Sequence, residues 1–223
     1  MFLDAVSSML PLQVIEILRK EGISTLRPAQ VKAVQAGLLN RKNLLVCTPT
    51  ASGKTLIAEM AALTTILSGK GKCVYIVPLK ALANEKFKEF TRKWGSLCRV
   101  AMSIGDLDSD EPNLQSKDLI ICTAEKLDAI LRHHAPWVRE LGCIVVDEIH
   151  LINDPSRGPV LEILITMLAQ VAKGAQCVGL SATIGNPQEL ADWLNAELVI
   201  DEWRPVPLYK GIYYDGKVEF EEP

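Results

Sequence analysis

Seven apolar runs rich in β-forming residues recur along this chain, and segments of helical length separate most of them. The runs are continuously apolar rather than alternating, so strands formed from them are expected to be buried on both faces of a sheet. Strands joined by helix-length crossovers pair in parallel, which predicts an α/β fold with a mainly parallel sheet sandwiched by helices. The runs are Leu44–Cys47, Cys73–Val77, Arg99–Ser103, Leu119–Cys122, Cys143–Val146, Cys177–Leu180 and Glu197–Ile200.

Helix-forming segments surround these runs. The sequence predicts a short amphipathic helix over Leu12–Arg19, closed by Gly22, and a second over Pro28–Leu39, whose proline suits a first helical turn. Near the end of the chain, Asp215-Gly216 between two β-rich stretches is a two-residue hairpin signal. The crossover helices are predicted at Lys54–Leu67, Leu79–Trp94, Glu125–Arg132, Gly158–Val171 and Pro187–Leu194.

These elements predict three parts: an N-terminal helical segment over 1–25, one large α/β domain over 26–204, and an exit segment with the hairpin over 205–223. With 48% hydrophobic residues the chain can bury a substantial core. A net charge of -3 does not advertise a nucleic-acid partner, although backbone amides and a few lysines are enough to bind phosphates.

The cysteines and the N-terminal sequence indicate the cellular compartment of the protein. The 6 cysteines form no Cys-x-x-Cys pair and histidine is scarce, so buried thiols in a reducing compartment are favoured over a zinc site. The N-terminus has neither a basic signal region nor a membrane-length apolar run. We expect an intracellular, soluble protein with no membrane partner, cytoplasmic or, in a eukaryote, nuclear.

A phosphate-binding loop is predicted where the first run ends, at Thr48 to Thr55. Small residues and Gly53 let backbone N–H groups approach a phosphate at a helix N-terminus. Lys54 can then reach the β- and γ-phosphates, and the Thr55 hydroxyl can bind Mg²⁺. Thr48 stands where the general G-x-x-x-x-G-K-S/T pattern has its first glycine, so a Gly-Lys-Thr that merely begins a helix is the alternative.

Two acids follow the fifth run. Asp147 is predicted to hold Mg²⁺, and Glu148 to orient or deprotonate the water that attacks the γ-phosphate. Solvated acids at a strand end are common, but the carboxyl ends of parallel strands share one edge of a sheet. Together with the phosphate loop, the pair therefore predicts a magnesium-dependent site for a nucleotide with a γ-phosphate.

Six motifs in order resemble the first RecA-like domain of superfamily 2 helicases, in their DExH branch, across residues 26–207. Threonine at 48 is ordinary in that family. The resemblance implies a RecA-like P-loop NTPase fold and the activity of an ATP-dependent helicase. The six motifs are Gln30, residues 48–55, residues 78–82, residues 123–126, Asp147-Glu148-Ile149-His150 and Ser181-Ala182-Thr183.

Three further stretches resemble the Ski-like group within this branch. They are Leu151, Asp154, Arg157-Gly158-Pro159 and Glu162 after the acid motif, Ile184-Gly185-Asn186-Pro187, and the exit sequence 203–207. Within the Ski-like group the chain is most similar to archaeal Hjm-type DNA repair helicases, which implies 3′–5′ unwinding of single-stranded or forked DNA in repair or replication restart. A Ski-like RNA helicase is the alternative.

The resemblance also implies a role for each motif residue. Gln30 would bond the adenine edge, and His150, Ser181 and Thr183 would couple the nucleotide site to the nucleic acid. Lys80 and Lys126 would contact the nucleic-acid strand, and for both the alternative is an ordinary solvated surface lysine. Nucleotide contacts are implied for Gln30, Thr50, Ala51, Ser52, Gly53, Lys54 and Thr55, and strand contacts for Pro78, Lys80, Gly105, Asp106, Thr123 and Lys126.

Helicases of this kind hydrolyse ATP between two RecA-like domains, and the second supplies arginine fingers worth ~10³–10⁵ in rate. Only residues 184–223 follow the last motif, so we expect a first-domain fragment that binds nucleotide weakly, hydrolyses it slowly and unwinds nothing alone. Two other classes compete with this interpretation. Another P-loop kinase or NTPase would lack the motifs at 78–82, 123–126 and 181–183, and a non-enzymatic nucleic-acid-binding module would not need Lys54, Thr55, Asp147 and Glu148.

Overall fold

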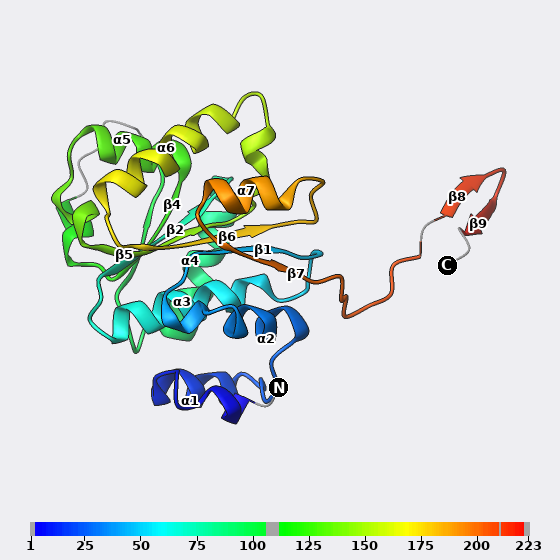
Figure 1. The fold of residues 1–223 in the computed structure, drawn as a ribbon, viewed down its shortest axis with the longest axis horizontal. Coiled ribbons are helices and arrows are strands. Elements are labelled where there is room, and N and C mark those ends of the chain that lie inside the picture. The colour runs from blue at the N-terminus through cyan, green and yellow to red at the C-terminus, as the bar shows by residue number, and fades with distance from the viewer. Residues whose placement is uncertain (1–2, 106–111, 210, 221–223) are drawn as a thin grey trace.

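A seven-stranded parallel sheet forms the centre of the computed structural model, which describes residues 3–105, 112–209 and 211–220 (Figure 1). The strand order is β3-β4-β2-β5-β6-β1-β7, and every pairing in this sheet is parallel. This confirms the predicted α/β fold. The strands are β1 (Leu44–Cys47), β2 (Lys72–Val77), β3 (Val100–Ser103), β4 (Leu119–Thr123), β5 (Leu141–Val146), β6 (Gln176–Ser181) and β7 (Glu197–Ile200).

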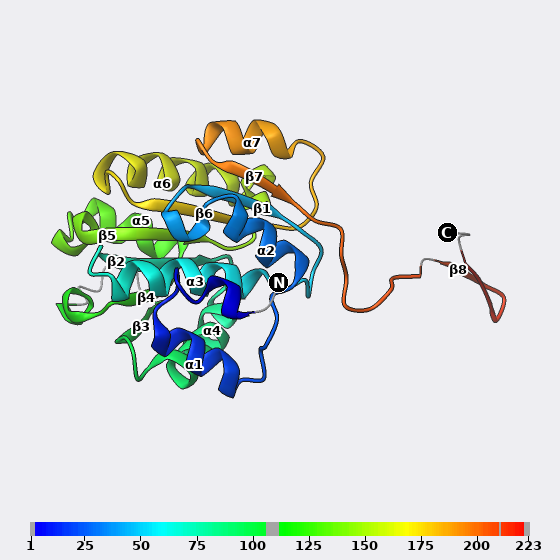
Figure 2. The ribbon, with the colours of Figure 1, turned by 60° about the horizontal axis from the view of Figure 1, so that its bottom comes forward.

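Helices cover both faces of the sheet (Figures 1 and 2). On one face lie α2, α3 and α4, with α1 outside them, and on the other lie α5, α6 and α7. The helices are α1 (Leu12–Lys20), α2 (Pro28–Gln35), α3 (Lys54–Leu67), α4 (Lys80–Trp94), α5 (Ala124–Arg132), α6 (Gly158–Val171) and α7 (Pro187–Trp193). Short 3₁₀ turns occur at Leu3–Val6, Leu38–Asn40, Pro112–Ser116, Pro136–Glu140 and Ile149–Asn153.

Two apolar clusters fill the spaces between the sheet and its helix layers. All residues of β1, β4 and β5 are buried, as expected for strands covered on both faces. The edge strands β3 and β7 depart from the prediction, because each has only one fully buried residue. An edge strand has one neighbour, so part of its surface reaches solvent.

One predicted helix is too long. The helix that begins at Pro28 ends at Gln35 rather than Leu39. Gly37 has a φ of 104°, a left-handed conformation that ends the helix, and Leu38–Asn40 forms a separate 3₁₀ turn. Glycine two residues past a helix end is a common stop signal that the apolar pattern around it concealed.

The N-terminal segment packs on the main body. Val14, Ile15 and Leu18 of α1 are fully buried in the cluster that contains α3 and α4. Glu21 pairs with both terminal nitrogens of Arg92 on α4, at 2.7 and 2.8 Å. The division at residue 25 stays a prediction, but the side chains of α1 contribute to the same core.

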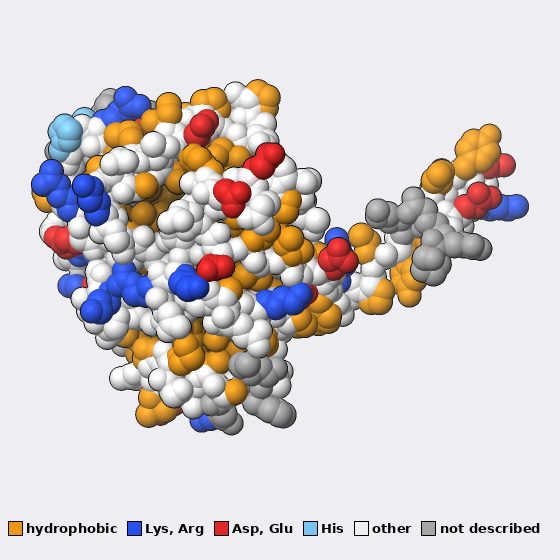
Figure 3. Space-filling model, viewed as in Figure 1, with side chains coloured by type: hydrophobic (Ala, Val, Ile, Leu, Met, Phe, Trp, Pro, Cys, Tyr) orange, Lys and Arg blue, Asp and Glu red, His pale blue; other side chains and the backbone are white. Residues whose placement is uncertain are grey.

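The exit segment ends in a hairpin of β8 (Gly211–Tyr214) and β9 (Lys217–Phe220), which projects away from the body (Figures 1 and 2). Asp215 and Gly216 both have positive φ, 47° and 77°, as a tight turn of this kind requires. This confirms the predicted hairpin. Its apolar side chains and those of the preceding segment are exposed (Figure 3).

Two chain-wide expectations concern membranes and thiols. No helix in the described parts of the chain combines the length and apolar character needed to cross a bilayer. All 6 cysteines are free, and five of them are buried, consistent with thiols used as small core residues.

Candidate active site

The carboxyl ends of β1, β6 and β5 lie side by side, because these strands are consecutive in the sheet. The phosphate loop follows β1, the motif 181–183 begins at the end of β6, and the acid pair follows β5. A backbone hydrogen bond from the Thr48 N–H to the Ser181 carbonyl, 3.2 Å long, joins the first two. Three of the six sequence motifs therefore meet at one edge of the sheet.

The phosphate loop is closed by its own side chains. The hydroxyls of Thr48 and Ser52, both fully buried, lie 2.7 Å apart. Threonine at the first-glycine position thus ties the two ends of the loop together. Ala51 has a φ of 64° and Gly53 a φ of 95°, so the backbone turns through left-handed conformations before α3 begins. Thr50 and Ala51 are exposed at the tip of the loop.

Lys54 lies within this loop. Its ammonium donates to the Thr48 carbonyl at 2.8 Å and to the Pro49 carbonyl at 3.3 Å. Burial lowers the pKa of Lys54, and the carboxylates of Glu148 and Asp147 oppose that shift. The ammonium and the acid pair are therefore close enough to interact electrostatically, as a shared phosphate and metal site requires.

Gln30 is buried, with 3% of its surface exposed, and it is engaged at both ends of its amide. Its oxygen accepts from the Arg27 N–H at 2.8 Å, and its nitrogen donates to the Gly53 carbonyl at 3.0 Å. Arg27 itself donates to the Ala51 carbonyl at 2.6 Å. The start of α2 is therefore bonded to the phosphate loop, beside a hollow of 380 Å³ that Gln30, Gly53 and Thr55 help to line.

The acid pair is held in a fixed geometry. One carboxylate oxygen of Asp147 accepts from the Tyr75 hydroxyl at 3.0 Å, and the other accepts from the Glu148 N–H at 3.1 Å. Glu148 has a φ of 50°, a conformation that non-glycine residues rarely adopt. Such backbone strain is concentrated at functional sites, where the surrounding structure must hold it in place.

The oxygen ligands near the loop suit a magnesium ion that is bound as a complex with a nucleotide. The Thr55 hydroxyl and the Asp147 carboxylate are the hard oxygen ligands that Mg²⁺ prefers. Across the described ranges there is no cluster of three or more His, Cys, Asp or Glu side chains that could hold a metal by itself. Mg²⁺ bound to a nucleotide needs only one or two protein oxygens, since phosphates and water supply the rest.

His150 connects the acid pair to the third motif. Its Nδ1 accepts from the Ala182 N–H at 3.4 Å and lies 3.4 Å from Oε2 of Glu148. Nδ1 of His150 therefore lies between the second acid of the pair and the backbone of the third motif. Ser181 is buried and Thr183 is exposed on either side of Ala182. The geometry links residues 147–150 to residues 181–183.

Most residues predicted on the strand path line a second hollow, of 370 Å³. Lys80, at the start of α4, is exposed, and the Thr123 hydroxyl caps α5 by accepting from the Lys126 N–H. Lys126 is only 2% exposed, so it is not the solvated surface lysine considered above. Asp106 lies outside the described residues. The predicted residues that line this hollow are Pro78, Lys80, Gly105, Thr123 and Lys126.

A hollow of 980 Å³, larger than the two described above, lies elsewhere, between α6 and α7 (Figure 3). Its lining includes Asn43, Ala175 and Ala196, which precede β1, β6 and β7 at the amino ends of the strands. None of the residues predicted from the motifs lines it. Size alone therefore does not identify the site, because ligands of open parallel sheets bind at the carboxyl edge.

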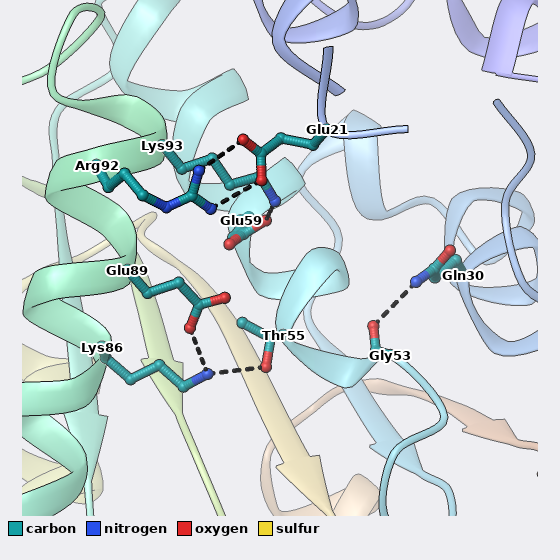
Figure 4. A network of polar contacts seen from close by, with 9 residues as sticks. All are labelled: Glu21, Gln30, Gly53, Thr55, Glu59, Lys86, Glu89, Arg92 and Lys93. Carbon is teal, nitrogen blue, oxygen red and sulfur yellow. Dashed lines mark hydrogen bonds and ion pairs between the residues drawn. The ribbon is translucent and has the colours of Figure 1, made fainter. Parts of the chain in front are cut away.

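Three residues that the sequence reasoning missed contact the site: Arg27, Tyr75 and Lys86. Tyr75 lies inside an apolar run, where its hydroxyl was the only polar signal. Lys86 lies in the interior of α4 and donates to the Thr55 hydroxyl at 3.2 Å (Figure 4). A helical lysine has no sequence signature that distinguishes it from a solvated one, so only the fold reveals this contact.

The chain is similar to known proteins over most of its length. The chain is 53% identical over 208 residues to the ATP-dependent DNA helicase Hel308 of Pyrococcus horikoshii, and 54% identical over 215 residues to that of Methanocaldococcus jannaschii. Each match covers 93% of this chain but only 28% and 18% of the relative. A crystal structure of the DUF1998 helicase MrfA bound to DNA superposes with a TM-score of 0.75 at 28% identity, covering 87% of this chain and 30% of that one.

A family match defines the class. Residues 27–190 match the DEAD/DEAH box helicase family. This range contains all six motifs, from Gln30 to Thr183, and six of the seven strands of the central sheet. The chain belongs to the DEAD/DEAH box helicase family.

Proposed function

We propose that this chain is the nucleotide-binding motor domain of an ATP-dependent DNA helicase. The strand order carries the proposal, because it brings the phosphate loop with Lys54, after β1, and the acid pair Asp147 and Glu148, after β5, to one edge of the sheet. The relatives named above are ATP-dependent DNA helicases of which this chain matches about a quarter or less. We therefore propose helicase activity for the whole protein of which this domain would be a part.

Each residue has a role that follows from its chemistry. The loop N–H groups and Lys54 hold the phosphates, and Lys54 leaves the carbonyls of Thr48 and Pro49 to do so. Thr55 and Asp147 would hold Mg²⁺, which neutralises charge on the β- and γ-phosphates when it is bound. Glu148 accepts the proton of the attacking water or orients it. Gln30 reaches the adenine edge by exchanging its bond to Gly53 for one to the base.

The strand of nucleic acid is assigned to the hollow at the ends of β2 and β4. N–H groups at the starts of α4 and α5 bind phosphates without reading sequence, and the ammonium of Lys80 adds a positive charge. The DNA helicases among the relatives support DNA over RNA. Unwinding with 3′–5′ polarity in DNA repair, and a second RecA-like domain that completes the cleft, are parts of the same proposal.

A binding experiment tests the nucleotide site. Lys54→Ala is expected to weaken Mg²⁺-ADP binding by about 30-fold or more, because it removes a partly buried charge from the phosphates. Lys70→Ala, an exposed lysine after α3, is the matched control and should bind like the wild type. Isothermal titration gives both affinities, and thermal melting shows whether each variant folds. Equal affinities for the two variants would remove Lys54 from the site and overturn the proposal.

A further inference from the structure

The Thr55 hydroxyl is engaged by a lysine from a neighbouring helix. Nζ of Lys86, on α4, donates to Oγ1 of Thr55 at 3.2 Å (Figure 4). Thr55 is the second residue of α3, so this contact joins the start of the phosphate-loop helix to the middle of α4. The same oxygen is the one that the proposed function assigns to Mg²⁺.

Lys86 also has a second partner. Its Nζ lies 3.0 Å from Oε2 of Glu89, one turn further along α4. The Lys86 side chain is only 13% exposed and lies 5.9 Å from the centre of the Phe90 ring. The ammonium is therefore held between a hydroxyl and a carboxylate at the site rather than extended into solvent.

A metal bound by Thr55 and this ammonium would share one oxygen. Mg²⁺ binds oxygen ligands at about 2.1 Å and would face a cation that lies at hydrogen-bond distance from the same atom. Two like charges a few ångströms apart repel strongly in a partly buried site. Glu89, already 3.0 Å from the ammonium, would remain its partner if Lys86 left the Thr55 oxygen.

We propose that Lys86 competes with Mg²⁺ for Thr55 and that, when the metal–nucleotide complex binds, it gives up Thr55 and keeps Glu89 as its partner. This inference rests on the proposed function, since it assumes that Thr55 is a metal ligand. Without nucleotide, Lys86 fastens α4 to the start of α3. With nucleotide, that fastening is released.

Loss of the Lys86 contact would affect the two halves of α4 differently, because two ion pairs hold its C-terminal half. Lys93 pairs with Glu59 of α3 at 2.6 Å, and Arg92 pairs with Glu21 (Figure 4). The N-terminal half of α4 begins at Lys80 beside the candidate strand hollow, and the Lys86 contact joins the end of this half to the start of α3. Metal binding at Thr55 would be transmitted to the nucleic-acid edge through this half-helix.

A magnesium titration tests the inference. ADP binding to the chain is measured while Mg²⁺ is raised, and again with the metal chelated. Lys86→Met is expected to lower the Mg²⁺ concentration for half-maximal binding by about three- to tenfold, because a competing charge is removed. Glu89→Gln should raise it, since the ammonium loses its alternative partner. Lys88→Met, an exposed lysine on the same helix, is the matched control.

The chelated measurement separates two roles for Lys86. Competition with the metal predicts that Lys86→Met and Lys88→Met bind metal-free ADP equally well. Weaker ADP binding by Lys86→Met with and without metal would mean that the ammonium contacts phosphate, which overturns the inference. The inference is also overturned if Lys86→Met and Lys88→Met need the same Mg²⁺ concentration for half-maximal ADP binding. Absence of metal-dependent ADP binding in the wild type overturns the proposed function itself, and this inference with it.

Discussion

The hydroxyl of Tyr75 donates a 3.0 Å hydrogen bond to the Asp147 carboxylate from the neighbouring strand β2. Tyr75 is fully buried, and its ring packs edge-on against Phe90 of α4, with centroids 5.2 Å apart. Burial raises the pKa of Tyr75 well above its usual value, and the Asp147 charge raises it further. The phenol therefore stays protonated and remains a donor that fixes the orientation of the carboxylate.

Tyr75→Phe keeps the ring and removes only this donor. Hydrogen bonds to charged groups are worth about 1.5–3 kcal/mol, so the Mg²⁺ concentration for half-maximal ADP binding should rise by about tenfold. Thermal melting should show a moderate loss of stability from the lost hydrogen bond, without unfolding, because the packing against Phe90 is kept. Tyr213→Phe, on the exposed hairpin, is the control. An unchanged magnesium requirement in Tyr75→Phe would show that Asp147 needs no help from the phenol.

Gly53→Ala is expected to disturb the loop in two ways. A Cβ at this position would lie 2.5 Å from Nε2 of Gln30, and the φ of 95° disfavours any side chain. Gly69→Ala is a matched control, because Gly69 also has positive φ but no atom within 4 Å of the added carbon. Both variants should lose about 1 kcal/mol of stability to backbone strain. Only Gly53→Ala should also lose ADP affinity, which isothermal titration calorimetry measures. Equal ADP affinities for Gly53→Ala and Gly69→Ala would contradict this prediction.

The buried pair of Glu59 and Lys93 predicts a pH-dependent stability. Its 2.6 Å contact joins side chains that are 2% and 8% exposed. Burial raises the pKa of Glu59 above its usual 4.5, and Lys93 opposes the rise. Between 4.5 and the raised value the folded state binds more protons than the unfolded chain. The contribution of Glu59 to stability is therefore present below this window and decreases as pH rises through it.

Lys93→Met removes the opposing charge and leaves Glu59 buried without its partner. At neutral pH we expect a loss of about 3–5 kcal/mol of unfolding free energy, and a smaller loss under acidic conditions, where Glu59 binds a proton. Urea denaturation of this variant and of Lys88→Met across a pH series measures both values. A deficit that does not vary with pH would mean that packing rather than charge explains the effect.

Lys80→Ala tests the nucleic-acid edge. Removal of one phosphate contact should weaken binding of single-stranded DNA for every sequence and reduce the slope of log affinity against log salt by about one. Lys70→Ala, before β2 at the amino ends of the strands, should leave the DNA affinity and the salt slope unchanged. Fluorescence anisotropy at several salt concentrations gives the slope. A Lys80→Ala slope equal to the wild-type slope would place the strand elsewhere.

The fold was largely predictable because its signal is local. Each apolar run from Leu44 to Ile200 became a strand, and Lys54–Leu67 and Gly158–Val171 form helices with the predicted bounds. The order β5-β6-β1 could not be read from the sequence, since it depends on how crossovers pack around the whole sheet. The early end of the Pro28 helix was missed because its apolar residues continue past Gly37.

At the candidate site, the motif residues were predictable and their supports were not. Lys54, Thr55, Asp147 and Glu148 occur in short patterns whose chemistry is explicit. Their supporting contacts come from segments distant in sequence: Tyr75 lies 72 residues from Asp147, and Lys86 lies 31 from Thr55. Contacts between distant segments depend on the assembled fold, so a single sequence without relatives does not contain them in readable form.

The position of β1 between β6 and β7 has a consequence for how the chain is made. Leu44 pairs with Val178 on one side and with Glu197 on the other, so both partners emerge from the ribosome long after β1 itself. Until then this strongly apolar segment has open edges and is a target for chaperones. The phosphate loop that follows β1 therefore gains both neighbouring strands of the sheet only after residue 200 has been synthesised, more than 150 residues after β1.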